Sequence, residues 1–93
     1  MLGQKIKELR EAKGLVQRQI AAKLEVDTAY VSKIESNEKP LSRNHIRKLA
    51  LLLDISEAEL LTIWLADKIL KIIGNEQCKS EALHLALKNI QNV

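Results

Sequence analysis

Residues 17–36 read QRQIAAKLEVDTAYVSKIES, and this stretch decides the fold. Its aliphatic residues recur at the spacing of an α-helix, first over residues 17–24 and again over residues 28–36. Between them lies Glu25-Val26-Asp27, which ends in a good N-cap for the second helix. Ala21 is small enough to let the two helices cross closely. The stretch therefore predicts two short helices joined by a tight turn.

The two helices divide their side chains between a core and an outer surface. Five aliphatic residues would form a compact core between them: Ile20, Leu24, Val26, Val31 and Ile34. The second helix then presents four short or basic side chains outward: Thr28, Ala29, Ser32 and Lys33. Such side chains suit a helix that enters the major groove of DNA, which is about 12 Å wide. The pattern thus favours double-stranded DNA as a partner.

The rest of the chain continues as helices and short loops. Four more helices are predicted, over residues 2–13, 43–53, 57–73 and 77–91. Ser42 is the expected N-cap of the second of these, and Ser56 with Glu59 forms a capping box for the third. Gly14 and Gly74 each stand where a helix should end.

Length and composition support an all-α fold. The 93 residues are enough for one domain, and the 46% hydrophobic fraction is nearly all aliphatic. Ala, Leu, Lys, Glu and Gln favour helix, and no β-rich run bounded by turn residues occurs. We expect a five-helix DNA-binding domain over residues 1–73. Residues 74–93 should add a C-terminal helix that packs on this domain or on a dimer interface.

Charge is unevenly distributed along the chain. Residues 1–48 hold eleven Lys and Arg against six Asp and Glu, whereas residues 49–93 hold four against six. The basic half suits a polyanionic partner such as DNA. An ordinary solvated surface is an equally good interpretation of the charge alone.

Several function classes find no support in the residues present. Cys78 is the single cysteine, which excludes an internal disulfide and a multi-cysteine metal site and fits a reducing cytoplasm. His45 and His84 lie on different predicted helices, and no nucleophile pair, carboxylate dyad or phosphate-binding glycine loop accompanies them. We expect no enzymatic activity, metal or cofactor.

The amphipathic N-terminus is no signal peptide, and no apolar run reaches the ~18 residues that span a bilayer. A cytoplasmic protein without membrane contact is expected.

Residues 6–40, IKELREAKGLVQRQIAAKLEVDTAYVSKIESNEKP, resemble the helix-turn-helix domain of the XRE family, which includes the lambdoid phage repressors and Cro proteins. The resemblance extends over about residues 2–66 and implies a lambda-repressor-like fold. The matching positions are Leu9, Arg10, Gly14, Leu15, Gln17, Ile20, Ala21, Leu24, Val26, Val31, Ser32, Ile34 and Glu35. Three positions depart from the family pattern: Val16 replaces a capping Ser or Thr, Glu25 replaces a turn glycine, and Asn37 stands where Gly is frequent.

The resemblance implies roles for individual residues at a DNA interface. Thr28, Ala29, Ser32 and Lys33 correspond to positions that meet base edges. Phosphate contacts are implied for Gln17, Arg18, Tyr30, Asn37, Lys39 and Arg43. For Tyr30, packing is an equally good interpretation. Arg10 and Glu35 match positions that form a partly buried ion pair between the first and third helices, and this structural role is favoured over DNA contact.

The predicted helix over residues 57–73 is apolar on more than one face, so most of its sides must be covered. We interpret it as partly core and partly dimer interface, with Leu61, Trp64 and Leu65 at the interface. Alternatively, the last helix folds back and covers this surface alone. A two-fold dimer would place two recognition helices about one DNA turn apart, near 34 Å, which fits an inverted-repeat operator.

Two functional hypotheses follow. The first is a sequence-specific transcriptional regulator that binds its operator as a homodimer, as a phage-type repressor, a restriction-modification controller or an antitoxin. The second is a protein-interaction module that uses its apolar C-terminal helices to bind a partner protein such as a toxin or a polymerase.

Overall fold

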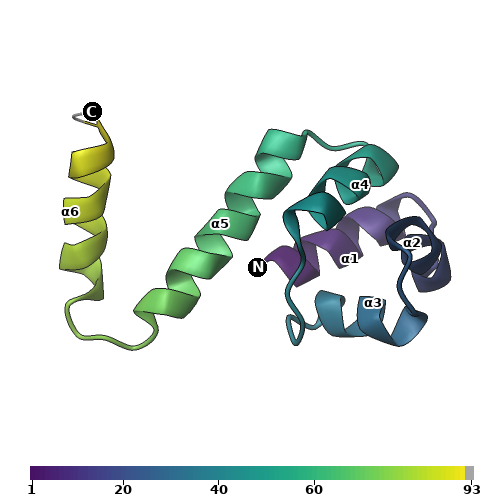
Figure 1. Cartoon of the computed structure of the whole chain (residues 1–93), viewed down its shortest axis with the longest axis horizontal. Helices are drawn as coiled ribbons and strands as arrows, with labels where there is room; N and C mark the ends of the chain where they lie inside the picture. Colours follow the sequence, from purple (N-terminus) through teal and green to yellow (C-terminus); the bar gives the residue numbers. More distant parts are fainter. Residues whose placement is uncertain (92–93) are drawn as a thin grey trace.

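The computed structural model describes residues 1–91, and all of its regular structure in that range is helical. Six helices follow one another along the chain (Figure 1): α1 (Leu2–Ala12), α2 (Gln17–Leu24), α3 (Thr28–Glu35), α4 (Arg43–Leu53), α5 (Glu57–Ile73) and α6 (Lys79–Gln91). The predicted all-α class is confirmed. Three helices are one or two residues shorter than predicted, because helix ends are set by the geometry of the cap rather than by apolar spacing.

The helices begin where a side chain can accept the first backbone N–H groups. Asp27 Oδ1 accepts from the backbone N–H of Tyr30 at 2.7 Å, and Ser42 Oγ accepts from that of His45 at 3.1 Å. Ser56 Oγ accepts from the Glu59 N–H at 3.2 Å, which is the Ser half of the predicted capping box. These local bonds explain why three helix starts were readable in the sequence.

Helix α2 starts without such an acceptor. The Val16 side chain carries no oxygen, so it leaves the α2 amides without a side-chain partner. Instead, Gln19 reaches back, and its Oε1 accepts from the Val16 N–H at 2.8 Å. The Val16 N–H thus gains a side-chain partner, whereas the first amides of α2 do not.

Positive backbone φ angles occur at both other positions where the chain departs from the family pattern. Glu25, at the end of α2, has φ 60° and ψ 44°, and Asn37, after α3, has φ 64°. Asp54 ends α4 in the same left-handed region, with φ 55°. For an L-residue this conformation costs roughly 1–2 kcal/mol, and Asn and Asp adopt it more readily than Glu.

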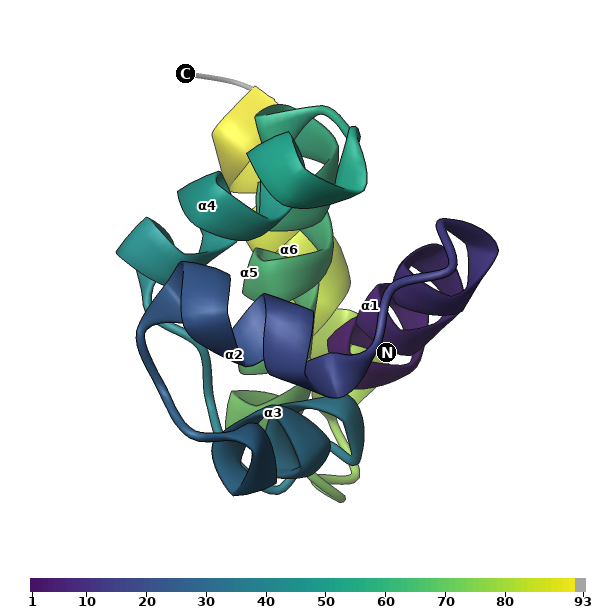
Figure 2. The same ribbon diagram turned by 90° about the vertical axis from the view of Figure 1, so that its right-hand side faces the viewer.

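The core lies among the first five helices. Its largest fully buried side chains come from α1, α2, α3, α4 and the start of α5: Ile6, Ile20, Val31, Ile46, Leu49, Leu53 and Leu60. The predicted core between α2 and α3 is present, with Val26 packed against it from the turn. Figure 2 shows α2 crossing in front of the body with α3 beside it and α4 above.

Gly3 allows α1 to approach the end of α3 closely. A Cβ atom at this position would lie 2.5 Å from the Ile34 carbonyl oxygen and 2.6 Å from that of Glu35. Because both atoms belong to the backbone, neither can move aside at low cost. The approach also lets Asn37 Oδ1 accept from the Gly3 N–H at 3.0 Å.

Helix α5 leaves the core after its first turns. Leu60 is fully buried, whereas Leu65, Ile69, Leu70 and Ile72 are between 46% and 83% exposed. Helix α6 has no buried residue and stands away from the body beyond the far end of α5 (Figure 1). Within this chain, therefore, the last helix does not fold back to cover α5, and that interpretation was wrong. Within residues 1–91 no helix combines the length and apolar character needed to cross a bilayer.

Candidate nucleic-acid interface

Helix α3 has one buried face and one exposed face. Val31, Ile34 and Glu35 are buried against α1 and α2. The opposite side carries the four side chains predicted to meet base edges, all of them exposed: Thr28, Ala29, Ser32 and Lys33. A surface helix with short side chains and a single cation on its outer face can enter a groove without steric obstruction.

An ion pair ties this helix to α1. Arg10 donates from Nε to Glu35 Oε2 at 2.7 Å and from an η nitrogen to Glu35 Oε1 at 3.1 Å. The two side chains are 11% and 5% exposed. Mainly through these hydrogen bonds, Glu35 raises the pKa of Arg10 above its ordinary value, although burial acts in the opposite direction. Arg10 also donates to the Leu15 carbonyl at 2.9 Å, so it fixes the turn that leads into α2.

Gln17, the first residue of α2, joins the same network. Its Nε2 donates to Glu35 Oε1 at 3.1 Å, and the side chain is half-buried. The bond orients the Gln17 amide beside the N-terminus of α2, where backbone N–H groups favour an anion. Arg18 follows on the exposed side. The link between Gln17 and Glu35 was missed by sequence reasoning, because nothing local signals a contact across eighteen residues.

The segment between α3 and α4 is held at several points. Tyr30 donates its hydroxyl to the Pro40 carbonyl at 2.8 Å, and its half-buried ring packs against the core. This geometry favours the packing interpretation of Tyr30. From α5, the indole Nε1 of Trp64 donates to the Leu41 carbonyl at 2.8 Å. Lys39 and Arg43 are exposed on either side of these anchored peptides.

The residues predicted at a dimer interface divide into two groups. Leu61 and Trp64 are half-buried and pack against the core of their own chain. Leu65 is 46% exposed. The internal contacts of Trp64 were not anticipated, since its bond to Leu41 spans twenty-three residues.

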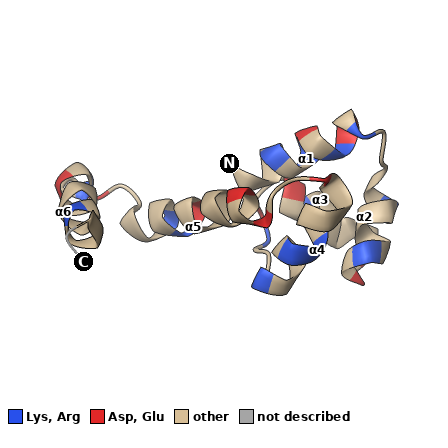
Figure 3. Ribbon diagram, turned by 90° about the horizontal axis from the view of Figure 1, so that it is seen from above, with Lys and Arg blue, Asp and Glu red and all other residues tan. Residues whose placement is uncertain are grey.

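Charge and shape around the site are mixed. Lys and Arg positions occur on α2 and α4, while α1 carries both signs along its length (Figure 3).

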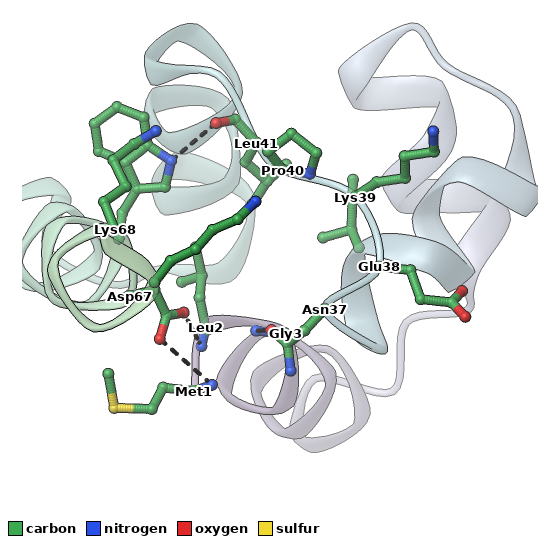
Figure 4. A pocket seen from close by; sticks show the side chains of 13 residues that line it. Met1, Leu2, Gly3, Asn37, Glu38, Lys39, Pro40, Leu41, Asp67 and Lys68 are labelled. Atoms are coloured by element: carbon green, nitrogen blue, oxygen red, sulfur yellow. Dashed lines mark hydrogen bonds and ion pairs between the residues drawn. The ribbon is translucent and has the colours of Figure 1, made fainter. Parts of the chain in front are cut away.

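A pocket of about 400 Å³ lies where the start of α1, the segment after α3 and α5 meet. Leu2, Asn37 and Leu41 are among its lining residues, with Lys39 and Lys68 also contributing (Figure 4). No group of His, Cys, Asp and Glu within residues 1–91 is arranged to hold a metal ion.

Comparison with known families gives a decisive match. The model of the helix-turn-helix family, HTH_3, matches residues 6–60, which include α2, α3 and the turn between them. The chain belongs to the XRE family of helix-turn-helix proteins. No curated protein matches the chain significantly.

Solved structures of XRE-type regulators are similar to this XRE-family protein. The restriction-modification controller protein C.AhdI from Aeromonas hydrophila is 42% identical, with a TM-score of 0.58, over 63% of this chain and 89% of C.AhdI. SinR, described as the master regulator for biofilm formation and solved in complex with DNA, is 37% identical over 66% of this chain and 98% of its own, with a TM-score of 0.58. A SinR–SinI complex matches 99% of this chain and 98% of the other at 26% identity, with a TM-score of 0.58.

Family and fold agree on the broad function. The chain is a DNA-binding transcriptional regulator with a lambda-repressor-like domain. Its family and structural neighbours are regulators rather than enzymes.

Proposed function

We propose that this XRE-family protein binds an inverted-repeat DNA operator as a homodimer and regulates transcription as a restriction-modification controller or a repressor. The exposed outer face of α3 carries the proposal. It presents Thr28, Ala29, Ser32 and Lys33 together, on a helix whose other side is fixed by the core and by the pair of Arg10 and Glu35.

Each of these four side chains has a chemistry that suits a base edge. Lys33 can donate to guanine O6 and N7, and Ser32 can donate or accept. The methyl groups of Ala29 and Thr28 can contact a thymine methyl. Sequence preference would therefore arise within a few consecutive base pairs.

Phosphate contacts would surround this reading face. Gln17 and Arg18 stand at the N-terminus of α2, where the helix dipole assists anion binding. Asn37, Lys39 and Arg43 border the segment after α3, and all three are exposed. The Tyr30 hydroxyl donates to Pro40, so it could serve a phosphate only through a rearrangement or as an additional acceptor. Such contacts would fix the register of the protein on DNA without reading sequence.

Dimerisation would use α5. Leu65, Ile69 and Ile72 recur at i, i+4 and i+7, so they form one apolar stripe, and all three are exposed. Leu61 and Trp64 lie nearer the core and would border the interface. Two copies joined across a two-fold axis would present two α3 helices to half-sites about one turn, ~34 Å, apart.

The controller role is favoured among the regulatory classes. C.AhdI, a restriction-modification controller, is 42% identical and aligns over 89% of its own length. A protein of this type acts on DNA in the cytoplasm, which we take as its location.

Selection of binding sites from a randomised duplex pool tests the proposal. Purified protein, with its helicity checked by circular dichroism, should recover an inverted repeat whose half-sites are about one turn apart. Recovery of a single half-site would contradict the dimer. Recovery of no sequence above background by folded protein would contradict sequence-specific binding altogether.

A second candidate function is that of a partner-binding module, which the apolar residues of α6 favour. Leu83, Leu85, Leu87 and Ile90 are between 39% and 71% exposed. The matching chain of the SinR–SinI complex, which aligns over 99% of this chain, was solved with a protein partner, and the partner proposed here is a small toxin or a polymerase. Salt separates the two functions, because phosphate contacts weaken steeply as salt rises whereas apolar docking hardly changes.

A further inference from the structure

We propose that Trp64 is a positioning residue for DNA binding. From α5 it fixes the segment between α3 and α4 and aligns the Arg43 side chain for a phosphate contact. The proposal rests on the proposed role of Arg43 at the DNA backbone and adds to it a residue outside the helix-turn-helix motif.

The first observation is that two successive carbonyl groups of this segment are held by two different helices. The Pro40 carbonyl accepts from the Tyr30 hydroxyl of α3, and the Leu41 carbonyl accepts from the Trp64 indole of α5, both at 2.8 Å. Peptide units are planar and rigid, so fixing two in succession leaves little freedom between them. The start of α4 is thereby set relative to the recognition helix.

The second observation concerns the cation at the start of α4. The Arg43 guanidinium carbon lies 5.4 Å from the centroid of the Trp64 ring, within cation–π range, although the side chain is exposed. A free Arg side chain loses rotamer entropy when it is immobilised. Resting on the indole removes part of this freedom before DNA arrives.

Lys68 is a second cation over the same ring. Its Nζ lies 4.4 Å from the same ring centroid, and Figure 4 shows Lys68 beside the indole that is joined by a dashed line to Leu41. Lys68 belongs to α5 and not to the start of α4, so its replacement removes a cation from beside the ring without touching Arg43.

The part of α5 that carries Trp64 is anchored to the rest of the domain. Leu60, one helical turn earlier, is fully buried in the core. Asp67, three residues later, accepts from the Leu2 N–H through Oδ2 at 2.8 Å and so ties α5 to the start of α1. Helix α5 is thus anchored on both sides of the tryptophan, and the indole can hold the segment rather than follow it.

The test measures how the affinity for a labelled duplex from the site selection depends on salt. The logarithm of the binding constant falls against the logarithm of salt concentration with a slope of about −0.9 per phosphate contact. Five proteins are compared with the parent: Arg43→Gln, Trp64→Phe, Trp64→Leu, the double variant of Trp64→Leu with Arg43→Gln, and Lys68→Gln as the control for loss of a cation beside the ring.

The proposal predicts distinct results for the two Trp64 variants. Trp64→Phe keeps an aromatic ring and loses the N–H, so affinity should fall roughly two- to tenfold at an unchanged slope. Trp64→Leu should reduce the slope by about 0.9, as Arg43→Gln does, and the double variant should show no further reduction. Lys68→Gln should keep the parental slope.

Two outcomes would overturn this proposal alone. A folded Trp64→Leu protein with the parental slope, while Arg43→Gln lowers it, would show that Trp64 does not align Arg43. An unchanged slope in Arg43→Gln would show that Arg43 makes no phosphate contact and would overturn this proposal. The proposed operator binding would still stand. Failure of the parent to bind any duplex would instead remove both.

A measurement without DNA keeps the proposal testable if Trp64→Leu does not fold. Trp64 is the single tryptophan, so the indole N–H gives one assignable resonance in a nitrogen–proton spectrum. Its hydrogen should exchange with solvent more slowly than that of free tryptophan, because it is bonded to Leu41. Exchange at the free rate would contradict the anchoring of the segment.

Discussion

Glu35 is a charged residue at the centre of the domain, and its carboxylate accepts from both Arg10 and Gln17. In Glu35→Ala, the guanidinium of Arg10 would remain nearly buried without its partner. Breaking a buried pair in this way typically costs about 3–5 kcal/mol. We expect the free energy of unfolding, measured in urea, to fall by about that amount.

The chain offers a matched control for this substitution. Glu57 pairs with Arg47 at 3.5 Å, but both side chains are about half exposed or more. Glu57→Ala should therefore change the free energy of unfolding by no more than about 1 kcal/mol. Equal losses in the two variants would mean that burial does not strengthen the Arg10–Glu35 pair.

Within residues 1–91, three non-glycine residues have positive φ angles: Glu25, Asn37 and Asp54. Glu25 is the least favourable of them, because the short polar side chains of Asn and Asp can hydrogen-bond locally in this conformation and that of Glu cannot. Glu25→Gly should raise the free energy of unfolding by up to about 1 kcal/mol, the relief of strain being partly offset by the flexibility of unfolded glycine. Thermal unfolding followed by circular dichroism measures the change. Glu25→Ala keeps the strain, so a comparable gain in that control would refute the explanation.

At the scale of helices, the two motif elements should respond differently to substitution. Lys33→Ala removes a cation from the outer face of α3 and should relax the preference at one base position by about 1–3 kcal/mol. Gln17→Ala removes a group at the start of α2 and should weaken binding to all sequences alike. Binding to a panel of duplexes with single-base changes distinguishes the two patterns.

A control for stability is needed at Gln17, because its amide also bonds Glu35. Binding should be measured well below the unfolding temperature of the variant. If both variants bind every duplex as the parent does, the assignment of the outer face of α3 to base reading is wrong.

Helix positions could be predicted because their signals are local. Three helices begin at a side chain that accepts the backbone N–H three residues later, namely Asp27, Ser42 and Ser56. Because donor and acceptor are close in the chain, the sequence alone predicts where these helices start. The contacts of Gln17 and Trp64 could not be predicted in the same way. Each joins residues that only the tertiary fold brings together, and no periodicity encodes the partner of a single polar side chain.

At the scale of the molecule, the apolar stripe on α5 should control assembly. Replacing Leu65 and Ile69 together by Glu should weaken the dimer at least roughly a hundredfold, because burying each such side chain contributes about 1.5–3 kcal/mol. Sedimentation equilibrium measures the change. Helicity should be unaffected, since both residues are exposed within one chain.

Leu51 provides the corresponding control on α4. It is 74% exposed, so Leu51→Glu introduces the same charge at an apolar surface position outside the stripe formed by Leu65, Ile69 and Ile72. The dimer constant of this variant should equal that of the parent. A parental dimer constant in the α5 double variant would place the interface elsewhere.

The core described above forms within a single copy, because the largest fully buried side chains among residues 1–91 lie between residues 6 and 60 and are covered by this chain alone. Folding is then a first-order event, whereas pairing through α5 would be second-order in protein. Below the dimer dissociation constant the melting temperature would depend little on dilution, whereas the concentration of dimer would rise with the square of the monomer concentration and the paired fraction in proportion to it. The rate of synthesis would then set when the protein reaches the concentration at which folded monomers pair and regulation begins.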